Sequence, residues 1–351
     1  MSDLGQRKTD HIELALHADV GFRKTTLLEQ VELVHAALPE LSWDELDTST
    51  TWFGKRVRSP LLIASMTGGN DRARELNLKL AEVAERGGYA IGLGSQRAMV
   101  KTGVIDAEVS ESYELRSVAP TTPLFGNIGI VQAAEMPLAL LQEMVGRVGA
   151  DALCVHLNPA QEMIQPGGDR DFRRGEETLA HLVRELGVPV LVKETGCGIS
   201  RDVARRLRGL GVEHVDVSGA GGTSWVAVEP HRATDEMQAR DALFWNWGIP
   251  TAASLLEVAP FDFRTVVATG GIRHGLDVAR AIALGATGVG IARLVLQKLE
   301  AGGVDGALGF LERIERDLKT AMLLTGSRSL ADLRRARRFL GPELAPWQHA
   351  G

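Results

Sequence analysis

A run of polar side chains near the middle of the chain has the residue types and spacing needed for acid–base or metal chemistry. Residues 156–162 read His-Leu-Asn-Pro-Ala-Gln-Glu, so the amide of Gln161 stands next to the carboxylate of Glu162. One carboxylate, together with water and phosphate oxygens, is enough to hold Mg²⁺. The alternative for Glu162 is a charge at the N-terminus of a helix, where the helix dipole stabilises it. Taken alone, the residue supports both interpretations.

Glycine pairs at residues 68–69, 221–222 and 270–271 form a second pattern, in a chain with 39 glycines among 351 residues. A glycine lets a backbone N–H approach a ligand where a Cβ would clash, and helix N-termini beside such turns bind phosphate. A tight turn would explain a single pair. Three pairs favour a phosphate-bearing ligand. FMN is the candidate, because no P-loop pattern occurs and residues 92–97 fail the dinucleotide fingerprint at its last position.

Lys193 ends a buried apolar run, where a cation needs an anionic partner or a flavin ring to offset its desolvation. A Schiff-base lysine is the competing interpretation, which the adjacent Glu194 disfavours by keeping the amine protonated. Of the two cysteines, Cys154 is expected to be a small core residue. Cys197 lies in a glycine-rich loop, where core packing and a reactive thiol are both open. No zinc motif accompanies them.

Basic residues cluster at both ends of the chain, and tryptophans gather between them. The first group could clamp a diphosphate or be a solvated chain start, and consists of Arg7, Lys8 and His11. The second is interleaved with apolar residues, which favours a solvated amphipathic helix over a polyanion site, and consists of Arg334, Arg335, Arg337 and Arg338. The tryptophans, which either wall an apolar pocket or pack their own segment, are Trp225, Trp245 and Trp247.

The apolar pattern predicts the elements that position these residues. Eight short runs rich in Val, Ile and Leu are continuous rather than alternating, as in parallel strands covered on both faces. They are residues 61–65, 90–94, 124–128, 152–157, 190–193, 214–218, 265–269 and 289–292. Helix-like segments separate most of them, most clearly at 72–86, 137–148, 175–186, 200–210 and 275–284. The alternation predicts an α/β fold, a (β/α)8 TIM barrel, over a doubly wound sheet.

A barrel of this type carries its active site on the loops that follow the carboxyl ends of the strands. Every predicted strand here ends in Gly or in a hydrogen-bonding side chain. We expect a single FMN-binding domain over residues 1–351. Its parts are an N-terminal extension at 1–59, with a polar helix near 10–20, a barrel at 60–300, an insertion after strand 6 at 219–263, and C-terminal helices at 301–351.

The composition is that of an ordinary globular protein, with 44% hydrophobic residues and a net charge of −6. The mildly acidic total argues against a dedicated nucleic-acid binder. Two cysteines exclude a disulfide scaffold and fit a reducing compartment. No apolar run approaches the ~20 residues of a spanning helix, and no signal peptide is visible. We therefore expect a cytoplasmic protein with no membrane partner.

Several motifs, taken in order, resemble type 2 isopentenyl-diphosphate isomerase. The most specific are Arg-Lys-Thr-Asp-His-Ile at 7–12 and Asn-Pro-Ala-Gln-Glu at 158–162, whereas the glycine motifs are shared with other FMN barrels. The resemblance runs from about residue 7 to residue 300, and its further motifs lie at 65–69, 94–97, 168–172, 221–225 and 270–273. One departure is Gly167, where an acidic residue is expected in the Gln-Pro-x-Gly-Asp motif.

The resemblance implies roles for individual side chains. The implied FMN contacts are Ser65, Met66, Thr67, Gly68, Ser95, Asn127, Lys193, Ser218, Thr223, Gly270, Gly271, Arg273, Ala292 and Arg293. The implied contacts to a diphosphate substrate are Arg7, Lys8, His11, Ser95, Gln96, Arg97, Asn158 and Gln161, with Mg²⁺ on Glu162. Gln161 and Glu229 would assist proton transfer. NADPH would reduce the flavin, and the chain would form a homo-oligomer, a tetramer or an octamer.

The family reaction moves a double bond between isopentenyl and dimethylallyl diphosphate, with no net redox change. The cation formed on the way needs a dry, electron-rich site, which reduced FMN would offer. The alternative is an FMN-dependent 2-hydroxy acid oxidase or dehydrogenase, which needs a His base after the late strands, and residues 218–221 have none. An enzyme similar to inosine-monophosphate dehydrogenase would need a Cys that residues 223–225 lack. A non-catalytic flavin-binding barrel is disfavoured by Gln161, Glu162, Arg7 and Lys8.

Overall fold

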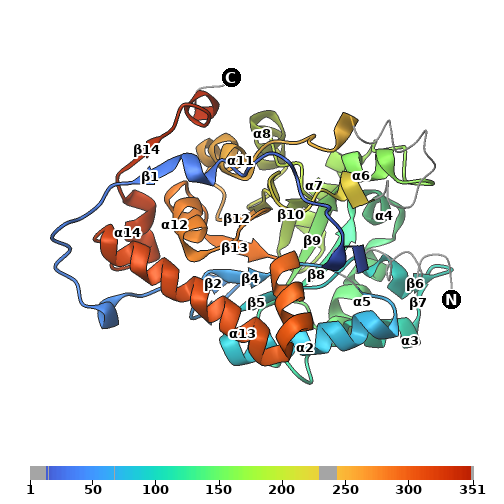
Figure 1. Cartoon of the computed structure of the whole chain (residues 1–351). Coiled ribbons are helices and arrows are strands. Elements are labelled where there is room, and N and C mark those ends of the chain that lie inside the picture. Colours follow the sequence, from blue (N-terminus) through green and yellow to red (C-terminus); the bar gives the residue numbers. More distant parts are fainter. Residues whose placement is uncertain (1–12, 15, 67, 229–242, 349–351) are drawn as a thin grey trace.

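Eight parallel strands close into a barrel, in the order β4-β5-β8-β9-β10-β11-β12-β13 (Figure 1). The computed structural model describes residues 13–14, 16–66, 68–228 and 243–348. The barrel strands are Leu61–Ile63, Ala90–Gly92, Leu124–Gly129, Ala152–Leu157, Val190–Glu194, His214–Asp216, Thr265–Thr269 and Gly288–Ile291. Each lies within or overlaps one of the predicted apolar runs, so the predicted TIM barrel is confirmed.

The continuous apolar runs form barrel strands because both of their faces are covered. All residues of β8 and β10 are buried, whether they point into the barrel or toward the surrounding helices. The register of β10 places Lys193 beside His156 of β9 and beside Asp216 of β11. Three ionisable side chains thus share one level near the carboxyl ends of their strands, where the active site of such a barrel is built.

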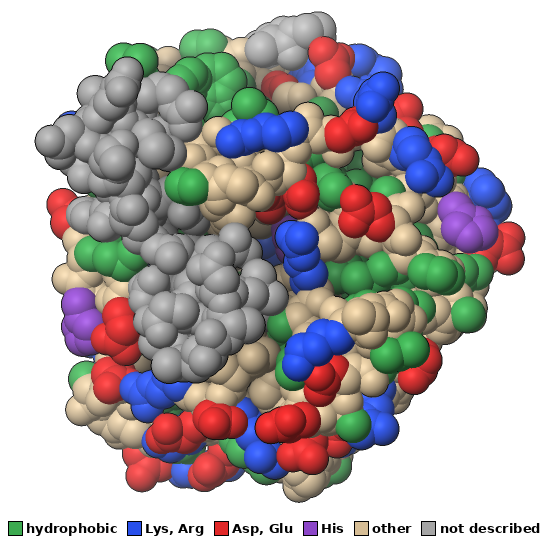
Figure 2. Space-filling view, turned by 90° about the vertical axis from the view of Figure 1, so that its right-hand side faces the viewer, with side chains coloured by type: hydrophobic (Ala, Val, Ile, Leu, Met, Phe, Trp, Pro, Cys, Tyr) green, Lys and Arg blue, Asp and Glu red, His purple; other side chains and the backbone are tan. Residues whose placement is uncertain are grey.

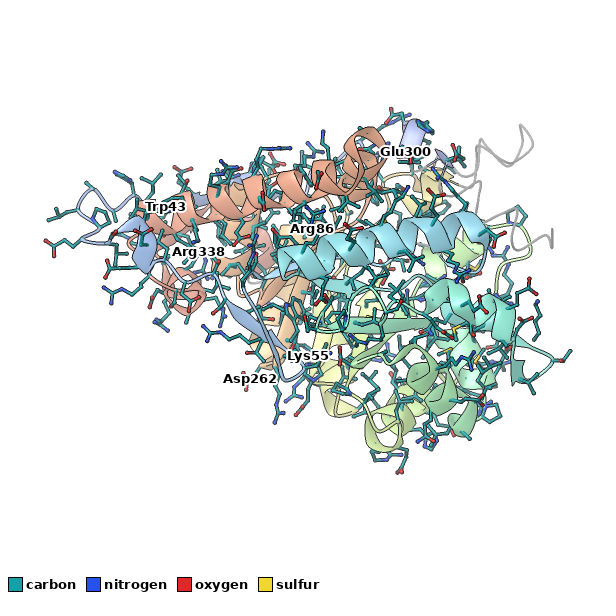
Figure 3. All side chains as sticks on the ribbon, turned by 90° about the horizontal axis from the view of Figure 1, so that it is seen from below. Trp43, Lys55, Arg86, Asp262, Glu300 and Arg338 are labelled. Carbon is teal, nitrogen blue, oxygen red and sulfur yellow. The ribbon has the colours of Figure 1, made fainter. Side chains whose placement is uncertain are left out.

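Helices surround the barrel and connect most of its strands. Those between strands are α2 (Asp71–Gly87), α3 (Ala107–Ser110), α4 (Ile130–Glu135), α5 (Leu138–Val148), α6 (Pro159–Ile164), α7 (Gly175–Glu185), α8 (Arg201–Gly209), α9 (Trp225–Val228), α11 (Thr251–Val258) and α12 (Gly275–Ala283). After the last strand come α13 (Arg293–Leu324) and α14 (Leu330–Arg335). Figure 3 shows α2 alongside α13, where Arg86 pairs with Asp305 at 2.7 Å and Arg72 pairs with Glu300 at 3.0 Å.

The N-terminal extension closes the end of the barrel where the strands begin. A hairpin of β2 (Thr50–Trp52) and β3 (Lys55–Val57) inserts Trp52 under the barrel. A Cβ on Gly288 would lie 2.2 Å from the Trp52 ring, so β13 needs a glycine there. A second hairpin, β6 (Val100–Lys101) and β7 (Val104–Ile105), follows β5.

The arginine-rich C-terminal segment departs from its prediction. Only α14 is helical, and the residues after it form β14 (Arg338–Leu340), which pairs antiparallel with β1 (Val31–Leu33) of the extension. The unpaired edge of β1 offers backbone groups that need partners, and this long-range pairing overrides the local helical pattern. Figure 1 shows the pair at the side of the molecule away from the barrel mouth.

The segment after β11 is only partly an insertion. All eight residues of α11 are buried, and this helix takes the place of the barrel helix that follows β11. In the part of the chain that the structure describes, no helix is both long and apolar enough to cross a membrane.

Candidate active site

Lys193 lies at the barrel mouth, and no carboxylate of the described residues forms an ion pair with it. Its side chain is buried, and its ammonium donates to the Glu194 carbonyl at 2.6 Å. The neighbouring Asp216 accepts from the Thr269 hydroxyl at 2.9 Å and from the Ser218 backbone N–H at 3.1 Å. Burial raises the pKa of Asp216, and the charge of Lys193 opposes that rise. Since no ion pair joins Lys193 to any described carboxylate, its charge is available to an anionic ligand.

His156 is a mouth residue to which the sequence assigned no role. Its Nδ1 lies 2.9 Å from Asn127 Oδ1, and Asn127 donates its own amide to the Leu93 carbonyl at 3.1 Å. That second bond orients the Asn127 amide, so Nδ1 of His156 donates and Nε2 is left as an acceptor. Burial, together with the charge of Lys193, lowers the pKa of His156 to about 3 and keeps the ring neutral. The signal that could have identified His156 is its predicted strand register beside Lys193.

Glu162 lies in the first turn of α6, with Asn158 at the N-cap. One carboxylate oxygen accepts from Asn158 Nδ2 at 2.8 Å, and the other accepts from the Asp169 backbone N–H at 2.9 Å. Each oxygen keeps a lone pair for a cation. Among the described residues no cluster of three or more potential ligands forms. A metal here would therefore depend on Glu162 with water and phosphate oxygens, while a structural role at the helix terminus fits the same position.

The loop after β5 carries the predicted substrate contacts Ser95, Gln96 and Arg97. The buried Gln96 amide is engaged inside the protein, accepting from the Asn127 N–H at 2.9 Å and contacting the Met99 sulfur at 3.1 Å. The Arg97 side chain is 46% exposed and lies 3.8 Å from Asp169. Arg97 can therefore reach a ligand over the mouth, whereas Gln96 holds the loop.

The paired glycines let two rim loops touch. A Cβ on Gly222 would lie 2.4 Å from the Gly271 nitrogen. Gly270 has a φ of +109°, and a Cβ there would lie 2.1 Å from the Gly219 oxygen. The requirement for glycine after β11 and β12 is thus accounted for by loop-to-loop packing at the mouth. Gly68 is needed for a different contact, because its Cβ would lie 2.0 Å from the Tyr113 ring.

The remaining predicted cofactor contacts follow the strand ends. Arg293 begins α13 directly after Ala292 and donates to the Ala18 carbonyl at 2.7 Å, tying the extension to the mouth. The Arg273 backbone N–H donates to Asp277 at 3.1 Å. The other described predicted positions on this rim are Ser65, Met66, Ser218, Thr223 and Gln161. Five predicted site residues lie outside the described residues: Arg7, Lys8, His11, Thr67 and Glu229.

The two cysteines both have thiol pKa values raised by their surroundings. Cys154 is buried in the barrel, as expected for a small core residue, and burial raises its thiol pKa to about 12. Burial and the nearby Glu194 carboxylate raise the pKa of Cys197 to about 12 as well. Since the thiolate is the nucleophile, the possibility of a reactive Cys197 loses its support.

The tryptophans of the segment after β11 divide between packing and exposure. Trp225 and Trp245 pack against Val20 and Ala227, and the Trp245 indole donates to the Gly21 carbonyl at 2.9 Å. Trp247 remains 60% exposed. Two of the three therefore join the segment to the N-terminal extension beside the mouth, which favours the packing interpretation for them. Figure 2 shows the side of the molecule that lies on the right in Figure 1. Basic side chains lie near the centre of this view, beside hydrophobic surface.

Comparisons with known proteins agree with this geometry. Residues 158–338 match the FMN-dependent dehydrogenase family. The isopentenyl-diphosphate delta-isomerase of Methanothermobacter thermautotrophicus is 43% identical, covering 98% of this chain and 95% of that protein. The enzyme of the same name from Archaeoglobus fulgidus is 40% identical, covering 97% of each. The one from Pseudescherichia vulneris is 43% identical, covering 95% of this chain and 96% of that protein.

Solved structures show the same fold at lower identity. A mandelate oxidase variant with a brominated 2-hydroxy-methylphenylacetate superposes with a TM-score of 0.67 at 22% identity, covering 97% of this chain and 100% of that one. A putative lactate oxidase of Pediococcus acidilactici gives 0.68 at 16% identity, covering 96% and 93%. The oxidases share the barrel, whereas the sequence similarity over almost the whole length is to the isomerases. The chain belongs to the isopentenyl-diphosphate delta-isomerase family, built on the barrel of the FMN-dependent dehydrogenases.

Proposed function

We propose that this protein isomerises isopentenyl diphosphate to dimethylallyl diphosphate. The observation that carries the proposal is the 40–43% identity to isomerases over nearly the whole chain. The matched length covers the β9 end, where Asn158 caps α6 and Gln161 and Glu162 lie in its first turn. The protein is therefore an enzyme that transposes a carbon–carbon double bond, and its substrate is a small diphosphate ester.

The residues at the mouth fit FMN as the cofactor. A flavin presents carbonyl oxygens and ring nitrogens that need donors, and the anionic reduced form needs a cation. Lys193 offers a buried ammonium, while Asn127 of β8, Thr269 of β12 and Ser218, directly after β11, offer polar side chains at the same mouth. The packed glycine loop after β12, the seventh barrel strand, lies where such barrels frequently bind phosphate. Ser65, Met66, Thr67, Gly68, Ser95, Thr223, Gly270, Gly271, Arg273, Ala292 and Arg293 would complete that site.

In this proposal the chain binds, orients and shields the substrate. When bound, reduced FMN supplies an electron-rich face and an acid–base group beside the alkene. Arg97 and Asn158, with Arg7, Lys8 and His11, hold the diphosphate, and Glu162 holds Mg²⁺ against it. Gln161 sits near the reacting carbons, and Glu229 assists proton transfer. Exclusion of water protects the intermediate cation from capture.

Several finer features belong to the same proposal. NADPH is the reductant that brings the flavin to its active state. The enzyme works in the cytoplasm as a homo-oligomer, a tetramer or an octamer. The support for these features is the family resemblance of the motifs at 7–12 and 158–162.

A 2-hydroxy acid oxidase is the second candidate, favoured by the shared barrel. That reaction needs a base beside the flavin. Residues 218–222 provide no histidine, and His156, with its pKa lowered to about 3 by burial, is a poor base. Neither of these two positions therefore supplies the base that oxidase chemistry requires.

The test is an anaerobic assay of purified protein with FMN, NADPH, Mg²⁺ and isopentenyl diphosphate, followed for dimethylallyl diphosphate. The protein should be yellow or bind FMN, and product should appear only when reductant and Mg²⁺ are both present. Absence of product, together with turnover of a 2-hydroxy acid, would replace the isomerase proposal with the oxidase one.

A further inference from the structure

Asp169 places a carboxylate among residues expected to hold a diphosphate. A negative charge at this position would repel the diphosphate unless it serves another purpose. The loop that carries it is wrapped closely around Glu162. A Cβ on Gly168 would lie 2.2 Å from the Glu162 carbonyl oxygen. The Asp169 backbone N–H donates to the Glu162 carboxylate at 2.9 Å, and Arg170 donates to the Glu162 carbonyl at 2.9 Å. The backbone of Asp169 is thus fixed relative to the β9 end.

The Asp169 side chain turns away from Glu162 and joins two other loops. Its Oδ2 accepts from Gln132 Nε2 of α4 at 2.5 Å and lies 3.8 Å from the Arg97 guanidinium. Gln132 is buried, so its amide is a fixed donor. Among the described residues, Arg97 forms no other ion pair, and Arg170 is engaged by backbone carbonyls. One carboxylate therefore connects the loops after β5, β8 and β9.

We infer that Asp169 is a positioning residue, which holds the Arg97 guanidinium over the mouth and is itself held by Gln132. The inference rests on the proposed function, in which Arg97 binds the diphosphate. A guanidinium meets phosphate oxygens in a specific planar geometry. An exposed arginine loses rotamer entropy when it adopts that geometry, and an ion pair formed beforehand reduces the loss.

Removing the charge of Asp169 distinguishes a positioning role from two other roles, repulsion of the diphosphate and binding of Mg²⁺. A carboxylate that only adds repulsion near the diphosphate would, on removal, leave diphosphate binding tighter. A carboxylate that binds Mg²⁺ would, on removal, raise the Mg²⁺ concentration needed for half-maximal activity. A positioning carboxylate, on removal, weakens diphosphate binding with the Mg²⁺ requirement unchanged.

The experiment measures binding of inorganic diphosphate to the FMN-loaded enzyme by calorimetry, with and without Mg²⁺. Asp169→Asn should weaken binding about fivefold to tenfold, and in the Arg97→Met background the same change should have almost no effect, since coupled residues are non-additive. KM for the substrate should rise in parallel while kcat stays within about twofold, as expected for an interaction made equally in ground and transition states. Asp171→Asn is the matched control, because that exposed carboxylate pairs with Arg173.

A second variant tests the hydrogen bond from Gln132 to Asp169 without replacing either side chain. A Cβ at Gly129 would lie 2.1 Å from Gln132 Oε1 and 3.1 Å from His156 Nε2, so Gly129→Ala should chiefly displace the Gln132 amide from Asp169 and weaken diphosphate binding in the same direction. Unchanged or tighter binding in Asp169→Asn, a shifted Mg²⁺ requirement, or full additivity with Arg97→Met would overturn the inference. Each of these results leaves isomerisation intact. Coupled diphosphate binding without any dimethylallyl product would instead refute the proposed function alone.

Discussion

Each end of the barrel has a lysine near a carboxylate, but the two groups form an ion pair at only one of the ends among the described residues. At the end where the strands begin, Lys55 lies 2.9 Å from Asp151. Asp151 also accepts from Arg116 at 2.8 Å and from the Leu124 N–H at 2.8 Å. Burial alone would raise the pKa of Asp151, but these donors lower it below its usual value. Figure 3 labels Lys55 on the hairpin that covers this end.

At the mouth the corresponding groups form no described ion pair, although the charge of Lys193 opposes the rise in the pKa of Asp216. Lys193 donates to a carbonyl, Asp216 is satisfied by Thr269 and the Ser218 backbone, and no described ion pair joins the lysine to a carboxylate. At the other end Lys55 and Asp151 are paired directly at 2.9 Å. At the base of the barrel, the charged side chains are therefore neutralised by other residues of the chain. At the mouth, the charge of Lys193 is left for a bound ligand to neutralise.

Replacing Lys193 or Lys55 by methionine should give the largest difference in activity between the two ends. Lys193→Met should lower isomerase kcat about 10²–10³-fold, because it removes the buried cation proposed to hold the anionic reduced flavin. Lys55→Met should leave kcat unchanged and reduce the free energy of unfolding by about 1–2 kcal/mol, since its partly exposed pair is screened. Steady-state kinetics and urea unfolding of both variants provide the check. Equal effects on activity would show that the two ends do not differ in role.

The metal assignment at the mouth predicts the next largest effect. Glu162→Ala should lower Mg²⁺-dependent activity about 10²-fold, because Glu162 is the carboxylate proposed to hold the ion and the described residues form no cluster of three or more potential ligands that could replace it. FMN affinity, followed by flavin fluorescence, should change much less. Equal loss of activity and FMN binding would move the metal elsewhere.

The glycine loops offer a comparison of packing rather than charge. Gly222→Ala should destabilise the protein by about 3 kcal/mol and impair FMN retention, since its Cβ would lie 2.4 Å from the Gly271 nitrogen. Gly146→Ala is the matched control, in the exposed face of α5 with nothing within 4 Å of the added atom. It should stabilise by about 0.5–1 kcal/mol. Thermal unfolding and flavin release of the two variants test this prediction, which fails if Gly222→Ala is neutral.

The two ends are also predicted to show pH dependences of opposite sign. Burial raises the pKa of Glu194 at the mouth from 4.5 to about 7. The folded state then keeps a proton that the unfolded state releases, so this group costs stability as pH rises from about 4.5 toward 7. Glu194→Gln removes that cost. The variant should gain about 2 kcal/mol relative to the wild type between pH 5 and pH 8 in urea unfolding.

Asp151 provides the control for that titration. Its pKa is lowered in the folded state, so it contributes stability above its unfolded pKa, and the contribution is lost as pH falls through its folded pKa. Asp151→Asn should therefore be more harmful at pH 8 than at low pH. A parallel pH profile for the two variants would contradict the contrast between the ends.

The sequence was sufficient for the barrel because each strand is continuous and apolar. The runs at 152–157 and 265–269 coincide with β9 and β12. Local patterning could not reveal β14, because its partner β1 lies about 300 residues away and supplies the missing backbone bonds. The same limit applies to α11, whose full burial depends on the barrel and on the loops around it.

The motifs of the candidate site could be predicted from the sequence, but the hydrogen bonds that join its loops could not. Lys193, Asn158 and Glu162 follow strand ends, so their shared rim could be expected from topology. The bond between Asn127 and His156, and the link from Asp169 to Gln132, depend on side-chain geometry between separate loops. The direct ligand contact expected of the paired glycines stays a prediction, because their observed requirement is loop packing.

The most direct measurement of the central claim is the redox balance of the reaction under anaerobic conditions. With FMN reduced by NADPH, the amount of dimethylallyl diphosphate formed should exceed many times over the NADPH and flavin oxidised, since isomerisation has no net redox change. Consumption of one equivalent of NADPH or flavin per product, or oxidation of a 2-hydroxy acid in place of isomerisation, would contradict a mouth built for double-bond transposition.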